Sequence, residues 1–237
     1  MKVIILYPNA AEISALALAD VLKCEALNPF EKDRRDFTEY DLVINYGCNR
    51  NIKAPAIVNR ASSVARCIDK YATFAILSEG DIPVPTFTSD KAIASKWECV
   101  VVRKDVKGNQ NNGMSYHYPE EFPLPHAPLY VKYFPHYKEY RVVVINGITT
   151  FCYEKVRKDG EWGFYLRDYQ YLIPIRTACM KAAELLAINY VGFDVLVNEN
   201  KEFVILEANS APILTDDSAR EIKKLVKRFE KELVNGA

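Results

Sequence analysis

The 237-residue sequence lacks four features that would place it in a specialised class. Its six cysteines include no CxxC pair, which argues against a zinc knuckle or a redox motif. Lysine plus arginine and aspartate plus glutamate both number 31, so no net charge attracts nucleic acid, and a nucleic-acid partner is disfavoured. No apolar run reaches the roughly 18–20 residues of a membrane span. The opening MKVIILYP is too short an apolar run for a signal peptide. These absences predict a folded cytoplasmic protein without a membrane partner.

The first 60 residues read as a small α/β unit. Residues 2–7 and 41–45 are short apolar runs, typical of buried strands, and residues 56–58 are a third candidate. Residues 11–22 lie between them and are rich in alanine and leucine, which favours a helix. Strands that alternate with a helix predict an α/β arrangement.

The rest of the chain predicts helices and antiparallel strands. A helix is expected over residues 62–78, capped by Ser62 or Ser63 and ended by Gly80. Prolines keep residues 82–86 out of helical conformation. Asn146-Gly147 between apolar runs is a strong hairpin signal. Strands are predicted at 99–103, 129–133, 140–145, 148–155, 192–197 and 202–206, and helices at 175–188 and 218–233. The overall class is therefore α+β.

One hairpin brings oxygen-bearing side chains together. If its turn is centred between Asn200 and Lys201, Asp194 lies directly opposite Glu207. Asn209 lies two residues further along, on the same face, because side chains alternate along a strand. A one-residue slip would send Asp194 to the other face. The hairpin thus predicts a polar patch of two carboxylates and one amide.

Two carboxylates directly opposite each other are destabilising unless something neutralises them. A hard divalent cation with oxygen ligands, such as Mg²⁺ shared with substrate phosphates, would do so. Lysine or arginine side chains at a sheet edge would do so equally well. The periodicity of the strands does not decide between these two arrangements.

The hairpin resembles the metal-binding end of the ATP-grasp superfamily. The resemblance is carried by Gly192-Phe193-Asp194 and by the run Val-Ile-Leu-Glu-Ala-Asn-Ser-Ala-Pro over residues 204–212. It implies that Asp194, Glu207 and Asn209 hold two Mg²⁺ ions, or Mn²⁺ in their place, against ATP. It extends over nearly the whole chain, and the compact size resembles small members near ribosomal-protein glutamate ligases and D-alanine–D-alanine ligase.

The resemblance also implies a nucleotide site. Lys70 and Arg103 match residues that contact phosphates, although the second is usually lysine and arginine has a different geometry. The loop over residues 107–113 matches a glycine-rich loop that closes over phosphates. Residues 130–134 match the strand whose backbone reads adenine. The implied nucleotide contacts are Lys70, Arg103, Gly113, Tyr130, Val131, Lys132, Tyr133, Glu139 and Lys155.

On the substrate side, the resemblance implies catalytic roles for Arg141, Arg157 and Arg167. These arginines would attend the γ-phosphate, the acyl phosphate or the tetrahedral oxyanion. The sequence departs from many relatives here, because Arg167 is followed by Asp168 and Tyr169 where they carry Arg-x-Asn. This departure concerns the substrate-side residues more than the ATP site.

The expected architecture is an ATP-grasp fold with an N-terminal α/β unit over residues 1–60. Residues 61–127 form a central subdomain with the glycine-rich loop, and residues 128–237 carry the antiparallel sheet and the metal site. The expected activity is ATP-dependent ligation of a carboxylate to an amine through an acyl phosphate. The carboxylate belongs to a small molecule, a peptide or a protein side chain, and small relatives are often homodimers. The alternatives are a kinase-like or carboxylase-like enzyme and a non-catalytic nucleotide-binding module.

Overall fold

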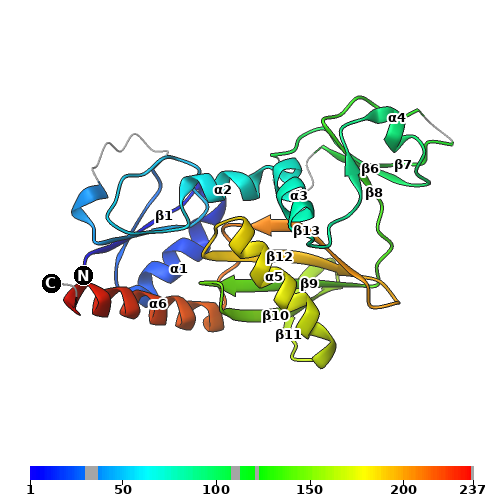
Figure 1. Ribbon diagram of the computed structural model, residues 1–237. Coiled ribbons are helices and arrows are strands. Elements are labelled where there is room, and N and C mark those ends of the chain that lie inside the picture. The colour runs from blue at the N-terminus through cyan, green and yellow to red at the C-terminus, as the bar shows by residue number, and fades with distance from the viewer. Residues whose placement is uncertain (30–36, 108–112, 121–122, 236–237) are drawn as a thin grey trace.

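The computed structural model describes residues 1–29, 37–107, 113–120 and 123–235, and it contains three sheets. A parallel sheet lies on the left of Figure 1, a four-stranded antiparallel sheet lies at the upper right, and a five-stranded antiparallel sheet lies below. No described helix is long and apolar enough to cross a membrane. The α+β class predicted from the sequence is confirmed.

The parallel sheet has the order β2-β1-β3-β4, formed by Glu25–Leu27, Val3–Leu6, Leu42–Asn45 and Ile57–Val58. One face packs on α1 (Glu12–Leu22) and on α6 (Asp216–Asn235), and the other face forms a separate core with Phe37 and Tyr40. Burial on both faces explains why β1 and β3 are continuous apolar runs instead of alternating ones. Strand β2 was not predicted, because Glu25–Leu27 is too short to show a period.

The four-stranded sheet has the order β5-β8-β6-β7, formed by Phe87–Thr88, Leu129–Lys132, Val100–Arg103 and Met114–His117. Helices α3 (Lys70–Glu79) and α4 (Lys91–Ala94) supply core residues on its two faces. Strand β8 belongs to this sheet, so the sheet extends past residue 127, where the sequence predicted the central subdomain to end.

The five-stranded sheet has the order β11-β10-β9-β12-β13. Its strands are Glu161–Leu166, Thr149–Lys158, Lys138–Ile145, Tyr190–Val197 and Phe203–Asn209. Helix α5 (Ile173–Leu185) covers one face (Figure 1), where alternate strand residues form an apolar core. At one end of the other face, Val143, Ile145, Tyr153 and Tyr190 pack on the parallel sheet. Beyond them, that face carries charged side chains together with Trp162 and Leu196.

The predicted Asn146-Gly147 turn is confirmed. Both residues have positive φ, 53° and 66°, as a turn of this type requires. The predicted helix over residues 62–78 is wrong in two respects. It is divided into α2 (Ala61–Ile68) and α3 at Asp69, whose carboxylate accepts a 3.0 Å hydrogen bond from the N–H of Ala72. Neither Ser62 nor Ser63 is the N-cap, because α2 begins at Ala61 and the Ser63 hydroxyl donates to the Ala187 carbonyl at 2.6 Å.

Asn59 joins the parallel sheet to the five-stranded sheet. Its side chain is fully buried, donates to the Tyr190 carbonyl at 2.7 Å, and accepts from the N–H groups of Asn189 and Tyr190 at 2.9 Å each. Its φ is 63°, in the left-handed region that asparagine tolerates better than most residues. One amide side chain therefore satisfies the backbone at the start of β12.

We expect replacement of Asn59 to destabilise the protein, because it leaves buried backbone groups of β12 without partners. Asn59→Gly should lower the free energy of unfolding by about 3 kcal/mol. Asn59→Ala should lower it by about 1 kcal/mol more, because alanine resists the left-handed conformation. Urea denaturation of both variants checks this, with the exposed Asn51→Gly as a control. Equal stabilities for Asn59→Ala and wild type would contradict the proposed junction.

Candidate functional site

The hairpin of β12 and β13 places Asp194 directly opposite Glu207, as predicted. The strand register that produces this pairing differs from the predicted one. Near the turn, Val195 faces Ile205 and Val197 faces Phe203, which is one residue out of the expected register. A bulge between Asp194 and Val195 then shifts the pairing and brings Glu207 into place. The two carboxylates therefore share a face only because of this irregularity.

Arg141 of β9 completes a row of charges across three strands. It is paired with Asp194 in the strand register, and Asp194 is paired with Glu207. The guanidinium binds Asp194 through two nitrogens: Nε contacts Oδ1, and Nη2 contacts Oδ2 at 3.0 Å. Both side chains are largely buried, with 13% and 14% of their surface exposed. Such a bidentate pair fixes both the position and the orientation of the carboxylate.

Lys155 of β10 is the second cation at Asp194. Its ammonium lies 3.2 Å from Asp194 Oδ2 and 3.0 Å from Glu139 Oε2. Burial alone would raise the pKa of Asp194, but Arg141 and Lys155 outweigh it, so the pKa lies below its ordinary value of 3.8. For Arg141 the two effects have opposite signs. Burial alone would lower its pKa, but the neighbouring Asp194 and Glu207 raise it. Asp194 is therefore ionised and neutralised by protein cations.

Glu207 receives its cations from the four-stranded sheet. Lys70, the first residue of α3, places its ammonium 3.7 Å from Glu207 Oε1. Arg103, the last residue of β6, is buried, and burial lowers its pKa while the charge of Glu207 opposes that effect. Its Nε is buried without a hydrogen-bond partner in the described part of the chain. The residues predicted to contact phosphate therefore converge on the predicted metal-binding carboxylates.

Asn209 and Gly192 occupy the next row of the sheet. The Asn209 Oδ1 accepts a 2.9 Å hydrogen bond from the N–H of Ala211, which orients the amide at the end of β13. Gly192 lies opposite Asn209, and a Cβ there would come within 2.9 Å of Arg141 Cδ and 2.8 Å of Pro212 Cβ. A glycine at this position is what lets the Arg141 side chain lie flat against the strand.

Within the described residues, no group of three or more His, Cys, Asp or Glu side chains is arranged to hold a metal ion. The predicted set contains only two such residues, Asp194 and Glu207, with Asn209 as the third oxygen donor. The role of this set in metal binding stays a prediction. What the structure does show is the alternative arrangement for its two carboxylates, which are paired with lysine and arginine.

The remaining predicted site residues around Lys155 lie on the same face. Glu139 accepts from Lys155 and also lies 3.2 Å from Nε2 of His136. Arg157 is exposed at the outer end of β10, and its guanidinium lies over the Trp162 ring, 5.9 Å from the centroid. Lys155 lies over the same ring at 5.0 Å. Trp162 thus flanks two of the predicted phosphate-side cations.

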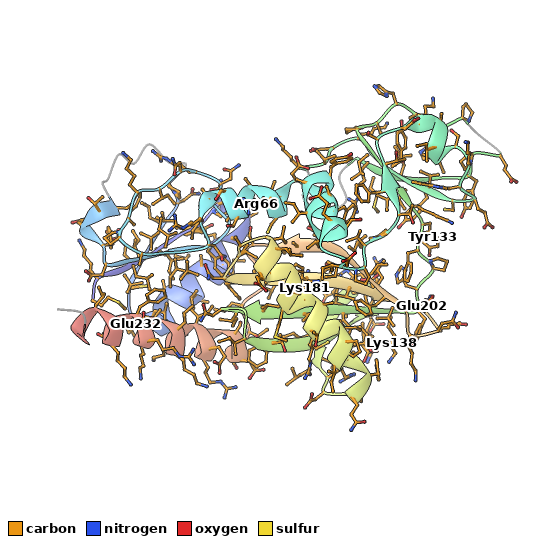
Figure 2. The ribbon with its side chains drawn as sticks, in the orientation of Figure 1. Arg66, Tyr133, Lys138, Lys181, Glu202 and Glu232 are labelled. Atoms are coloured by element: carbon orange, nitrogen blue, oxygen red, sulfur yellow. The ribbon has the colours of Figure 1, made fainter. Side chains whose placement is uncertain are left out.

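The segment predicted to read adenine, residues 130–134, is the last part of β8 and the two residues after it. The side chains of Tyr130 and Val131 are buried in two different cores, and the Lys132 side chain is exposed. The N–H groups of Lys132 and Tyr133 already donate to the carbonyls of Thr86 and Cys99, at 2.8 and 3.0 Å. Tyr133 lies on the connection between the two antiparallel sheets, with Lys138 at the near end of the lower one (Figure 2).

Only the ends of the predicted glycine-rich loop lie within the described residues, since residues 108–112 fall outside them. Gly113 has a φ of 74°, which favours glycine, and its carbonyl accepts a 2.9 Å hydrogen bond from the N–H of Lys104. The N–H of Lys70 donates to the Val106 carbonyl at 3.0 Å. The start of the loop is therefore attached to the same helix end that carries the Lys70 ammonium.

Arg167 is not brought to this site. Its N–H donates to the Cys152 carbonyl, and its Nε binds Glu154 Oε2 at 2.7 Å on the sheet face covered by α5. Lys138 binds the other oxygen of Glu154 at 3.2 Å. The sequence could not reveal this, because the face on which Arg167 lies depends on the register of β11. The structure therefore separates Arg167 from Arg141 and Arg157, with which it was grouped.

Strand β11, with Trp162 and Phe164, was not predicted from the sequence. A usable signal was present in Asp159-Gly160, a hairpin-type dipeptide flanked by Val156 on one side and Trp162 on the other. Both residues have positive φ, 51° and 88°, in the same kind of turn. Applied a second time, the same rule would have predicted this hairpin and the aromatic side chains beside Lys155.

We expect Asp194→Asn to lower the free energy of unfolding by about 3 kcal/mol at neutral pH, because Arg141 and Lys155 lose their shared partner. Since the folded-state pKa of Asp194 is depressed, its stabilisation is complete above the ordinary value of 3.8 and is lost as the pH falls through the lower, folded value. The difference between variant and wild type should therefore shrink below about pH 4.

Chemical denaturation at several pH values between 2 and 7 measures this difference. Asp168→Asn is the matched control, because Asp168 also pairs with an arginine but its side chain is 87% exposed. It should change the stability by less than about 1 kcal/mol. An Asp194→Asn protein as stable as wild type at neutral pH would show that the charge row does not support the fold.

Comparison with known proteins places this geometry in context. No protein-family model matches the sequence, and no curated protein matches it. Solved structures do match in fold. The ATP-grasp ligase PsnB, complexed with a minimal precursor, Mg and ADP, has a TM-score of 0.72 at 13% identity, covering 96% of each chain. D-alanine–D-alanine ligase from Bacillus anthracis, complexed with ATP, has a TM-score of 0.71 at 14% identity, covering 98% of this chain and 96% of that one.

The macrocyclase MdnC from Microcystis aeruginosa MRC, bound with the precursor peptide MdnA, is a third similar structure. Its TM-score is 0.65 at 9% identity, covering 95% of this chain and 99% of MdnC. The similarity is one of fold, since each identity is far below the level at which sequences alone are informative. It nevertheless extends over nearly the full length of all four chains.

Proposed function

We propose that this chain, which has the ATP-grasp fold, is an ATP-dependent ligase that joins a carboxylate to an amine through an acyl phosphate. The fold is shared with ligases solved with ATP or ADP. Fold alone does not determine function, so the proposal depends on the site. The residues that support it are those where the two antiparallel sheets meet.

The observation that carries the proposal is a buried cation with an unused donor. Arg103 is only 6% exposed, and its Nε has no hydrogen-bond partner in the described part of the chain. Burying a guanidinium with an unpaired N–H destabilises the folded protein. This cost is offset where an anionic ligand binds and accepts a hydrogen bond from that N–H. Lys70 lies beside the same carboxylate, Glu207. Two cations from the four-stranded sheet thus suit the phosphates of a nucleotide bound between the sheets.

The donor set on the hairpin fits a magnesium ion shared with those phosphates. Asp194, Glu207 and Asn209 offer carboxylate and amide oxygens, the ligands that Mg²⁺ prefers. About a third of the Glu207 side chain is exposed, so it is accessible from the space between the sheets. When bound, the metal would supply charge neutralisation to the phosphates. Two ions are expected, as in the ATP-grasp superfamily.

The chemistry follows from the poor leaving group of a carboxylate. Attack of a substrate carboxylate oxygen on the γ-phosphorus of ATP forms a new P–O bond and releases ADP. The amine then attacks the carbonyl carbon of this acyl phosphate, and phosphate leaves in place of oxide. The protein contributes positioning and charge neutralisation. Lys70, Arg103 and Lys155 would hold phosphate oxygens, and the exposed Arg157 would meet the transferred group.

The nature of the two substrates is drawn from the neighbouring structures. PsnB and MdnC were solved with precursor peptides, and the ligase from Bacillus anthracis acts on D-alanine. We therefore propose that the carboxylate belongs to a peptide, a protein side chain or a small amino acid. A kinase-like enzyme of the same fold would instead leave a phosphorylated product, and a non-catalytic module would bind nucleotide without turnover.

The first test is calorimetric titration with a non-hydrolysable ATP analogue, with and without Mg²⁺. Wild type should bind the analogue more tightly with Mg²⁺, and Glu207→Ala should lose that dependence, because a metal ligand is removed. Turnover is then followed as release of ADP and phosphate in the presence of candidate carboxylates and amines. A ligase releases both products only when carboxylate and amine are present together.

Glu202→Ala is a matched control, since Glu202 lies on the same hairpin near the turn and hydrogen-bonds only Asn198 among the described residues. It should bind the analogue as wild type does. Failure of wild type to bind the analogue in either condition would refute the nucleotide site. Binding that proceeds without turnover on any substrate pair would favour the non-catalytic module.

Arg103→Met should separate binding from stability. Removing the guanidinium eliminates a buried unpaired donor but also takes a cation away from Glu207, so the free energy of unfolding should change by less than about 1 kcal/mol. The substitution should weaken nucleotide binding by about tenfold or more, because one charge-assisted phosphate contact is lost. Thermal denaturation and the same calorimetry measure both effects. Lys104→Met, which changes the exposed neighbour, is the control, and an Arg103→Met protein with unchanged affinity would contradict the assignment.

A further inference from the structure

Each carboxylate of the predicted metal site is already paired with protein cations. Asp194 is bound by Arg141 and Lys155, and Glu207 lies near Lys70. The pairs arise from the strand register, since Arg141, Asp194 and Glu207 lie in one row across β9, β12 and β13. The protein cations therefore neutralise the carboxylates, and these cations affect how a metal ion can bind.

Arg141 and Lys155 differ in how firmly they are held at Asp194. Arg141 makes two contacts with the carboxylate, is 13% exposed, and is packed beside Gly192, where a Cβ would come within 2.9 Å of it. Lys155 makes one contact with Asp194 and another with Glu139. Lys155 can therefore leave Asp194 and keep an ionic partner, whereas Arg141 would become an unpaired buried charge.

A divalent cation that approaches Asp194 meets these two positive charges at short range. In a partly buried site such repulsion is only weakly screened by salt. Nucleotide phosphates reverse the balance, because they attract Lys155, Lys70 and Arg103 and add negative charge beside the carboxylates. The order in which metal and nucleotide bind is therefore set by the protein cations.

We propose that Arg141 is a positioning residue that holds Asp194 and, together with Lys155, prevents a divalent cation from binding until nucleotide phosphates are present. This inference rests on the proposed function, because it assumes that Asp194 is a metal ligand. It assigns Arg141 to the carboxylate instead of to the substrate. It also makes the site selective for the metal–nucleotide complex over the free metal ion.

The test is binding of Mn²⁺, followed by the electron paramagnetic resonance signal of the free ion, with and without the non-hydrolysable ATP analogue. Wild type should bind Mn²⁺ at least about tenfold more tightly with the analogue than without it. Arg141→Met should raise the affinity for Mn²⁺ alone by about tenfold, because a positive charge next to Asp194 is removed. Arg141→Lys keeps that charge and should stay close to wild type.

Lys155→Met provides a second variant that leaves the buried Arg141–Asp194 pair in place. It should also raise the affinity for Mn²⁺ alone, so the test holds if Arg141→Met does not fold. Arg220→Met is the matched control, since Arg220 pairs with Asp217 on the exposed surface of α6. It should leave Mn²⁺ binding unchanged with and without the analogue.

Two outcomes would overturn the inference. One is tight binding of Mn²⁺ by wild type without the analogue. The other is an unchanged affinity for Mn²⁺ alone in folded Arg141→Met and Lys155→Met proteins. Both outcomes leave the proposed function standing, provided that wild type still binds the analogue with Mg²⁺ in calorimetry. Absence of that binding would instead contradict the proposed function itself.

Discussion

Two carboxylates face each other on neighbouring buried strands, and the arrangement of the site depends on how their repulsion is relieved. Like charges directly opposite each other in a sheet are destabilising, so Asp194 and Glu207 need nearby cations. Asp194 obtains its cations within its own sheet, from β9 and β10, whereas Glu207 obtains them from α3 and β6 of the other antiparallel sheet. Relief of one repulsion therefore links α3 and β6 to the carboxylates of the five-stranded sheet.

The two faces of the five-stranded sheet have different roles: one packs in the core, and the other carries the charged side chains of the candidate site. Because side chains alternate, the face under α5 is mostly apolar, and its charged side chains Lys138, Glu154 and Arg167 are paired with one another. The opposite face packs on the parallel sheet at one end, and beyond Gly192 it carries charged side chains. Trp162, at the edge, lies over the two outermost cations of this polar region. The site is thus bounded by packing on one side and by an aromatic ring on the other.

Much of this was predictable from local patterns, and the failures share a physical cause. The Asn-Gly turn and the Ala/Leu-rich helices follow from residue type and period, so they were found, whereas the predicted pairing of Asp194 with Glu207 is present only because a bulge compensates for a register that was one residue out. The break at Asp69, the bulge after Asp194 and the side of the sheet on which Arg167 lies depend on tertiary contacts that no short window contains. The partner of Arg141 is of the same kind, because Asp194 lies 53 residues away in sequence.

The core beneath the parallel sheet has a consequence for biosynthesis. It combines Ile5 and Leu18 from the first residues of the chain with Ile222 and Leu225 from α6, nearly the last. Contacts of such large sequence separation form slowly, and a chain emerging from the ribosome cannot form them until its final helix is free. Strands β1 and β3, which are translated well before α6, must therefore wait with part of one apolar face uncovered. That interval is when the nascent polypeptide depends most on chaperones that shield exposed hydrophobic surface.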